Sequence, residues 1–223
     1  MSTLNNLALL QQKIGNFAKA EELYKKNLTK TRATYGAKHP SYATSLSNLA
    51  GLYEAIARYK DAEKLYIEAL QIRKESLGDK HPSTGLTMVN LGRLYVALKN
   101  YSKADSMWYK ATNLDLYMIQ KHFPSMSEKE KGEFYATIRL HFEQFNSYAL
   151  VRAAKEPSIL GKMYNNQLAT KALLLNASNK LRHTILESGD TVLIEKFQNW
   201  LNQKEFLSKV YACLLYTSPS PRD

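Results

Sequence analysis

Apolar residues in the first part of the chain recur with the spacing of helices that bury one face. In one segment they stand at positions i, i+3, i+4 and i+7, and a second such stripe begins a few residues later. The stripes consist of Leu46, Leu49, Ala50 and Tyr53, and then of Tyr59, Ala62, Leu65, Tyr66, Ala69 and Leu70. The short break at residues 56–59 predicts that these two helices lie antiparallel.

This pair of stripes returns with a fixed period of 42 residues, which Pro40, Pro82 and Pro124 mark. Similar residues stand at the same place in all three copies. Examples are Leu7, Leu49 and Leu91, then Ala20, Ala62 and Ala104, and then Tyr24, Tyr66 and Trp108. Such a period indicates a repeat architecture, in which each helix pair buries its apolar face against the next pair.

The longer break between units contains residues that end one helix and begin the next. Gly78 suits the left-handed position after a helix, and Pro82 suits a first helical turn. His39 and His81 precede proline in equivalent loops. Helix packing separates such loops by at least ~8–10 Å, too far for two nitrogens that each lie ~2 Å from one zinc ion. We therefore expect both histidines to cap helices, and we predict no metal site and no cofactor.

The repeated pattern resembles the tetratricopeptide repeat. That family has a large residue, then Leu, a small residue and Tyr in the first helix, and Ala, an aromatic residue and Ala in the second. The second unit matches with Leu46, Leu49, Ala50, Tyr53, Ala62, Tyr66 and Ala69. Because 42 residues exceed the usual period, the units are similar to the kinesin-light-chain type. The resemblance implies an all-α fold, an α-α superhelix or tetratricopeptide solenoid. Residues 1–124 would form three helix pairs. We expect the first pair to be truncated at its start and the natural protein to begin upstream.

By the same resemblance, the first helix of each pair lines a concave groove that binds an extended peptide or protein segment. Asn6, Asn48 and Asn90 form a ladder at one position of the repeat. An amide side chain both donates and accepts, so it can bind a peptide backbone of any sequence, whereas a basic side chain binds a carboxylate. The alternative is that each Asn only fixes the stacking of adjacent repeats. The candidate groove residues are Asn6, Lys13, Ser47, Asn48, Asn90 and Arg93.

After Pro124 the period ends and longer helical patterns follow. Ser127 and Glu130 form a capping box before a helix that runs to about residue 154. A second helix is predicted over residues 159–187, and Asp190 is placed to cap a third at 191–212. We expect this bundle of longer helices, residues 125–212, to be a connector that packs on the third repeat.

A string within the connector, residues 171–190, carries a second resemblance. KALLLNASNKLRHTILESGD is similar to the helical connector of bacterial proteins that join tetratricopeptide repeats to a CHAT domain, a caspase-like cysteine protease. The resemblance implies that the chain is the regulatory or targeting arm of such a protein. A caspase-like site needs a paired His and Cys. No such pair is found, so no catalytic residue and no enzyme activity are predicted. The alternative is a stand-alone scaffold or adaptor without a protease.

The last eleven residues, 213–223, read CLLYTSPSPRD and contain the single cysteine. They resemble a sequencing adaptor translated in frame, and we expect them to be a non-native tail. The alternative is a disordered Ser/Pro tail.

The chain carries a net charge of +11, and residues 1–124 alone carry +8. Such a surface favours an acidic peptide, nucleic acid or an anionic surface. The lysines are scattered without a dense run, which indicates a solvated outer face and disfavours nucleic acid. No apolar run approaches ~18 residues, so no membrane span is predicted. The predicted partner is a protein or peptide, the oligomeric state is left open, and the resemblance to bacterial proteins predicts a cytoplasmic location.

Overall fold

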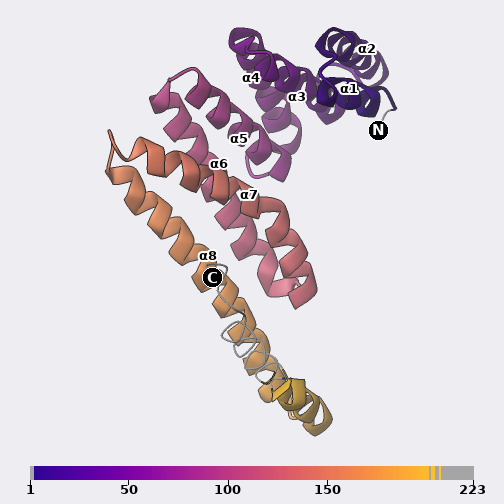
Figure 1. Ribbon diagram of the computed structural model, residues 1–223. Coiled ribbons are helices and arrows are strands. Elements are labelled where there is room, and N and C mark those ends of the chain that lie inside the picture. Colours follow the sequence, from indigo (N-terminus) through magenta and orange to yellow (C-terminus); the bar gives the residue numbers. More distant parts are fainter. Residues whose placement is uncertain (1–2, 201, 204–205, 207–223) are drawn as a thin grey trace, which may run out of the picture. The chain divides into compact units, whose positions relative to one another are not determined.

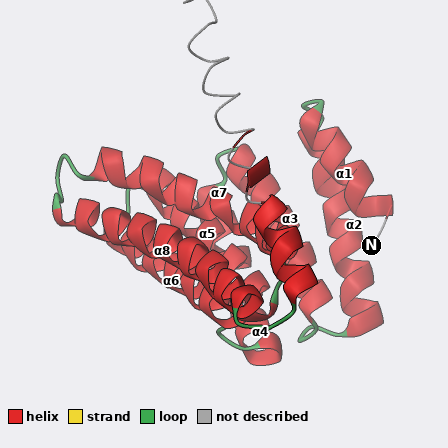
Figure 2. Cartoon of the chain, turned by 90° about the horizontal axis from the view of Figure 1, so that it is seen from below, coloured by secondary structure: helices red, strands yellow, loops and turns green. Residues whose placement is uncertain are grey.

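The computed structural model describes residues 3–200, 202–203 and 206. Within these residues every regular element is a helix (Figures 1 and 2). The elements are α1 (Thr3–Lys13), α2 (Phe17–Tyr35), α3 (Pro40–Ala55), α4 (Tyr59–Leu77), α5 (Pro82–Ala97), α6 (Tyr101–His122), the 3-10 helix η1 (Phe123–Ser125), α7 (Glu128–Arg152) and α8 (Ser158–Leu186). Residues 191–200 are also helical. The predicted all-α fold class is confirmed. No helix of the described residues combines the length and apolar content needed to cross a membrane.

The chain divides into two compact units, Met1–Thr170 and Lys171–Asp223. In the first unit α1 and α2, α3 and α4, and α5 and α6 form three helix pairs (Figure 1). Each pair packs on the next, because α2 contacts α3, α4 contacts α5 and α6 contacts α7. The turn inside each pair needs one residue with positive φ. Gly15, Ala57 and Lys99 take this conformation, with φ of 84°, 59° and 58°, and they stand 42 residues apart.

The breaks between pairs have the predicted chemistry. Gly36 and Gly78 follow α2 and α4 with φ of 86° and 89°. The backbone N–H of Ser41 donates to Nδ1 of His39 at 3.1 Å, and Ser83 makes the same bond to His81, so the capping role of both histidines is confirmed. In the third unit the residue in register with Gly78 is a glutamine. Without the glycine the helix does not stop there, and α6 continues to His122.

The core lies where the helices of a pair approach closely. The small residues at the crossing points are fully buried, and each pair carries one large aromatic side chain, Tyr24, Tyr66 or Trp108, that is at most 3% exposed. In the third pair Trp108 of α6 lies directly against Gly92 of α5. A Cβ atom at Gly92 would lie 3.0 Å from the indole ring. The small residues are Ala8 and Ala20, Ala50 and Ala62, and Gly92 and Ala104.

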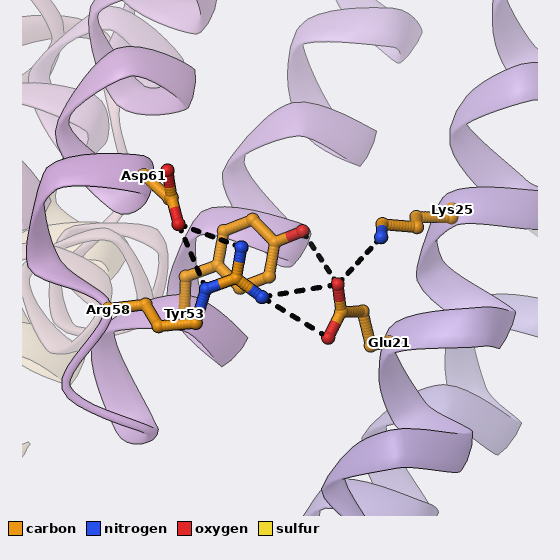
Figure 3. A network of polar contacts seen from close by, with 5 residues as sticks. All are labelled: Glu21, Lys25, Tyr53, Arg58 and Asp61. Atoms are coloured by element: carbon orange, nitrogen blue, oxygen red, sulfur yellow. Dashed lines mark hydrogen bonds and ion pairs between the residues drawn. The ribbon is translucent and has the colours of Figure 1, made fainter.

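A polar network joins the first pair to the second (Figure 3). The carboxylate of Glu21 in α2 accepts from the hydroxyl of Tyr53 in α3 at 2.9 Å and forms ion pairs with Lys25 at 2.7 Å and Arg58 at 3.3 Å. The Arg58 guanidinium also lies 4.1 Å from the centroid of the Tyr53 ring and pairs with Asp61 at 2.7 Å. The hydrogen bond from Lys25 lowers the pKa of Glu21 against the raising effect of burial, and the bond from Tyr53 adds to the lowering.

The same arrangement of acid, tyrosine and cation recurs at the next two junctions. Glu63 pairs with Lys103 at 3.2 Å, and the Lys103 ammonium lies over the Tyr95 ring. Burial, followed by the hydrogen bond to Glu63, raises the pKa of Tyr95 to about 12. At the third junction Asp105 accepts from Tyr148 at 2.6 Å and faces Arg152 at 3.6 Å. Glu21, Glu63 and Asp105 stand 42 residues apart.

Helix α7 therefore packs against the third pair in the way that α3 packs against the first pair and α5 against the second. Its side chains Phe145, Tyr148 and Ala149 are buried in the same cluster as Trp108, together with Ile159 of α8. The predicted capping box is present, since Ser127 accepts from the backbone of Glu130 and Glu130 accepts from that of Ser127. Asp190 also caps the helix after it, because the Leu193 N–H donates to its carboxylate at 3.0 Å. Residues 213–223 lie outside the described residues.

Replacement of Gly92 by alanine tests the close contact with Trp108. The added methyl group meets a rigid buried ring, so we expect Gly92→Ala to lower the free energy of unfolding by about 1–3 kcal/mol in urea titration. A Cβ atom added at Gly132 in α7 would have no atom within 4 Å. Gly132→Ala is the matched control, and it should stabilise by about 0.5–1 kcal/mol through helix propensity. Equal effects of the two changes would contradict the packing argument.

Candidate functional site

A pocket of ≈ 230 Å³ opens between α1, α2 and α3. Its walls are rich in hydroxyl and amide groups, with one lysine and no acidic side chain. The lining residues are Asn5, Asn27, Lys30, Thr31, Thr34, Tyr35, Ser41, Thr44, Ser45 and Asn48. Such walls offer hydrogen bonds to a polar ligand without an opposing negative charge. We call this space the first-junction pocket.

Asn48 is the predicted ladder residue that lines this pocket. Its Nδ2 donates to Oδ1 of Asn5 in α1 at 2.7 Å, so the amide contact between repeats involves Asn5 instead of the in-register Asn6. Asn6 is exposed, and Asn90 is half-buried on α5. The bond fixes adjacent helices, as the stacking hypothesis expects, while the pocket beside it leaves Asn48 within reach of a ligand. The structure is therefore compatible with both hypotheses for Asn48, contact with a ligand and fixation of the stacking of adjacent repeats.

The remaining predicted groove residues have other surroundings. Ser47 donates to the Ala43 carbonyl of its own helix at 2.9 Å. Arg93 makes two hydrogen bonds, of 2.7 and 3.0 Å, to the carboxylate of Glu54. The bond to Glu54 raises the pKa of Arg93, and the fork geometry fixes its guanidinium. Lys13 is exposed in the last turn of α1. Of the six candidates, only Asn48 lies in the first-junction pocket.

Sequence reasoning missed the contribution of the second helix to this pocket. Half of the lining comes from α2, and Thr31 is the residue that explains why the pocket is open. Thr31, Arg73 and Asp115 stand 42 residues apart, and each faces the first helix of the following pair. The sequence did hold a signal for this difference between junctions, because one position of the repeat changes from Thr to Arg to Asp in successive units.

At the second junction Arg73 occupies the equivalent space. Arg73 is only 4% exposed, and its guanidinium donates to the Ser83 carbonyl, the Thr87 hydroxyl and the Thr44 hydroxyl. Burial lowers the pKa of Arg73. Ser83 and Thr87 are in register with Ser41 and Ser45 of the first-junction pocket. A short Thr31 thus leaves open the space that a long Arg73 fills.

At the third junction Asp115 takes this position and lies 2.9 Å from Nδ1 of His141 in α7. Both side chains are largely buried. Burial raises the pKa of Asp115, and the hydrogen bond with His141 acts in the opposite direction. This pair closes the third junction, and the described residues contain no cluster of three or more His, Cys, Asp or Glu that could hold a metal ion.

Comparisons with known proteins agree with this architecture. The tetratricopeptide repeat family model matches residues 1–74 and 57–115, which together cover just over half of the chain. The crystal structure of BtubC (BKLC) from P. vanneervenii is similar with a TM-score of 0.53 and 19% identity, over 80% of this chain and 63% of that chain. The chain therefore spans less than two thirds of the length of BtubC. A comparison with curated proteins finds no match.

A second solved structure is a point variant of the nearly identical TPR-like repeats from a Podosopora anserina protein described as a kinesin light chain. It has a TM-score of 0.50 and 19% identity, over 88% of this chain and 95% of that chain. At these identities the likeness shows the fold alone. The resemblance to kinesin-light-chain-type repeats is thus confirmed at the level of structure.

The pair of Asp115 and His141 gives a pH-dependent prediction. His141→Leu leaves a buried carboxylate unpaired, so we expect a loss of about 3–5 kcal/mol in the free energy of unfolding at neutral pH. Because folding raises the pKa of Asp115, its carboxyl favours the folded state when it is protonated. This contribution is present at low pH and is lost as the pH rises through the raised pKa. The loss in His141→Leu should therefore shrink on acidification, as measured by urea titration across pH.

The double variant Asp115→Leu/His141→Leu is the control for this prediction. It removes both charges together, and it should be more stable than His141→Leu at neutral pH. A loss in the single variant that is independent of pH would show that the unpaired carboxylate is not its cause.

Proposed function

The chain belongs to the tetratricopeptide repeat family, whose members are generally protein–protein interaction scaffolds, and we propose that it binds an extended peptide or protein segment. The segment lies along α1, α3 and α5 and is anchored in the first-junction pocket. The observation that carries this proposal is the pocket itself, which the small Thr31 leaves open beside Asn48. Asn6, Lys13, Ser47, Asn90 and Arg93 remain proposed contacts along the same groove.

The polarity of the pocket supports a peptide as its ligand. Asn48 uses one amide hydrogen on Asn5 and retains a second. Lys30 and Tyr35 are exposed at the pocket, where they can bind carbonyl or carboxylate groups of the segment. The net charge of the repeats favours a segment with acidic residues.

We propose further that the chain is the regulatory or targeting arm of a larger bacterial, cytoplasmic CHAT-protease protein. The string at residues 171–190 supports this, because it resembles the connector between repeats and protease in such proteins. In this proposal residues 1–124 bind the partner, residues 125–212 connect, and residues 213–223 are not native. The alternative is a stand-alone scaffold or adaptor, which the repeats alone fit equally well.

The variant Thr31→Arg tests the first-junction pocket directly. Arg73 shows that the fold accommodates an arginine at this position of the next pair, so the variant should fold while its side chain fills the pocket. Peptides selected from a random-peptide display on the wild-type chain should bind Thr31→Arg about tenfold or more weakly. Affinity is measured by titration calorimetry, and helix content by circular dichroism.

Thr31→Ser is the matched control, because it keeps a short hydroxyl side chain and should retain full affinity. Binding that is unchanged in Thr31→Arg would exclude this pocket as the anchor. If Asn48→Ala lowers thermal stability but leaves affinity intact, the amide ladder only fixes the stacking of the repeats.

The larger protein can be tested at the level of the gene. We expect the source DNA, sequenced across the codon for Ala212, to continue in frame into a domain with a spaced His and Cys. A stop codon, or a natural continuation as CLLYTSPSPRD, would remove the basis for the protease arm and leave the scaffold as the better proposal.

A further inference from the structure

A second cavity, of ≈ 580 Å³, lies between α5, α6 and α7 in the first unit. We call it the third-junction cavity. It shares no residue with the first-junction pocket or the predicted ladder, but Arg93, one of the predicted groove residues, lines it. Its lining residues are Arg93, Val96, Trp108, Leu140, Glu143, Gln144, Ser147 and Tyr148.

The repeat register explains why a cavity stands here. In the first pair the hydroxyl of Tyr24 donates to Gln12 at 3.2 Å, and in the second pair Tyr66 donates to Glu54 at the same distance. Gln12 and Glu54 are in register with Val96. The third pair thus has a larger aromatic donor, Trp108, and an apolar residue where the acceptor stands in the other two.

Two buried polar atoms remain without a hydrogen-bond partner around this cavity. They are Nε1 of Trp108, a donor, and Oε1 of Gln144, an acceptor. An unpaired buried polar group is unfavourable, because it has lost its hydrogen bonds to water without gaining others. Trp108 and Gln144 both line the cavity. A carbonyl would pair with the indole N–H, and an N–H with the amide oxygen, once a ligand in the cavity displaces the atoms that cover them. A backbone amide has this combination.

The charges at the cavity are already compensated by the protein. Arg93 pairs with Glu54 at 2.7 Å, and Glu143 pairs with Arg139 at 3.1 Å. An ionic ligand would therefore meet no unmatched charge. Val96 offers an apolar wall, and Leu140 is 54% exposed, so burial of an apolar side chain there removes hydrocarbon from water.

We infer that the third-junction cavity binds an uncharged apolar side chain of the partner segment, together with the backbone amide that carries it. The inference rests on the proposed function, because the segment that fills the cavity is the one that lies along α1, α3 and α5. It adds a second anchor of different chemistry. The first-junction pocket takes a polar group, and the third-junction cavity takes an apolar residue whose amide reaches Trp108 and Gln144.

The variant Val96→Gln tests this inference by giving the third pair the acceptor that Gln12 provides in the first. Its side chain should occupy the cavity and accept from the indole N–H, so the variant should be at least as thermally stable as the wild type. The probe is N-acetyl-phenylalanine amide. Its binding is followed by the 1H–15N NMR signal of the Trp108 indole. The chain has two tryptophans, so the signal that remains in the variant Trp200→Phe is that of Trp108.

We expect the probe to shift the Trp108 signal saturably in the wild-type chain. The variant Val96→Gln should weaken this binding roughly tenfold or more, whereas Val96→Thr, which keeps the volume but cannot reach the indole, should retain it. N-acetyl-glutamate should bind more weakly than the phenylalanine amide. No saturable shift, or equal binding by Val96→Gln and Val96→Thr, would overturn the inference.

The variant Thr31→Arg separates this test from that of the proposed function. It blocks only the first-junction pocket, so the response of Trp108 to the probe should be unchanged. Selected display peptides that lose affinity in Thr31→Arg but not in Val96→Gln would support the proposed function and contradict the second anchor.

Discussion

The close approach of the two helices in each pair is the constraint on which the rest of the structure depends. Small residues at both crossing points let the backbones come together, and one large aromatic side chain fills the remaining space. The contact has little tolerance, because protein cores are packed at crystal density. In the third pair a tryptophan replaces the tyrosine, and a glycine replaces the alanine opposite it, so a gain in volume on α6 is matched by a loss on α5.

Burial alone does not fix how successive pairs face each other, since it is not directional. Polar contacts supply that direction. Glu21, Glu63 and Asp105 each accept from or pair with groups of the following pair, and Tyr148 and Arg152 let α7 join this series although its sequence lies outside the 42-residue period. The cations that pair with Glu21 and Glu63 are exposed, and such pairs add little stability individually. Their repetition specifies the position at which each pair docks on the next.

The two candidate anchors arise where the repeats differ from one another. Thr31 leaves open a space that Arg73 fills one junction later, and Val96 removes the acceptor that Gln12 and Glu54 provide. A solenoid of identical units would have identical junctions. Each departure from the register leaves space or an unpaired donor at one junction. In the proposed function these differences let an otherwise uniform groove distinguish among segments.

The sequence by itself determined the helix pairs, their breaks and the caps at His39 and His81, because these depend on local periodicity and on residues close in the chain. The place of Asn48 at a contact between two adjacent helix pairs was also an expectation from the repeat. Only the tertiary structure decided that Asn48 contacts Asn5 and that Arg93 is held by Glu54. Residues about 40 apart meet through the packing angle of adjacent helices, and the sequence period does not specify this angle. For the same reason the pocket behind Thr31, lined from two helix pairs, emerged only from the folded chain.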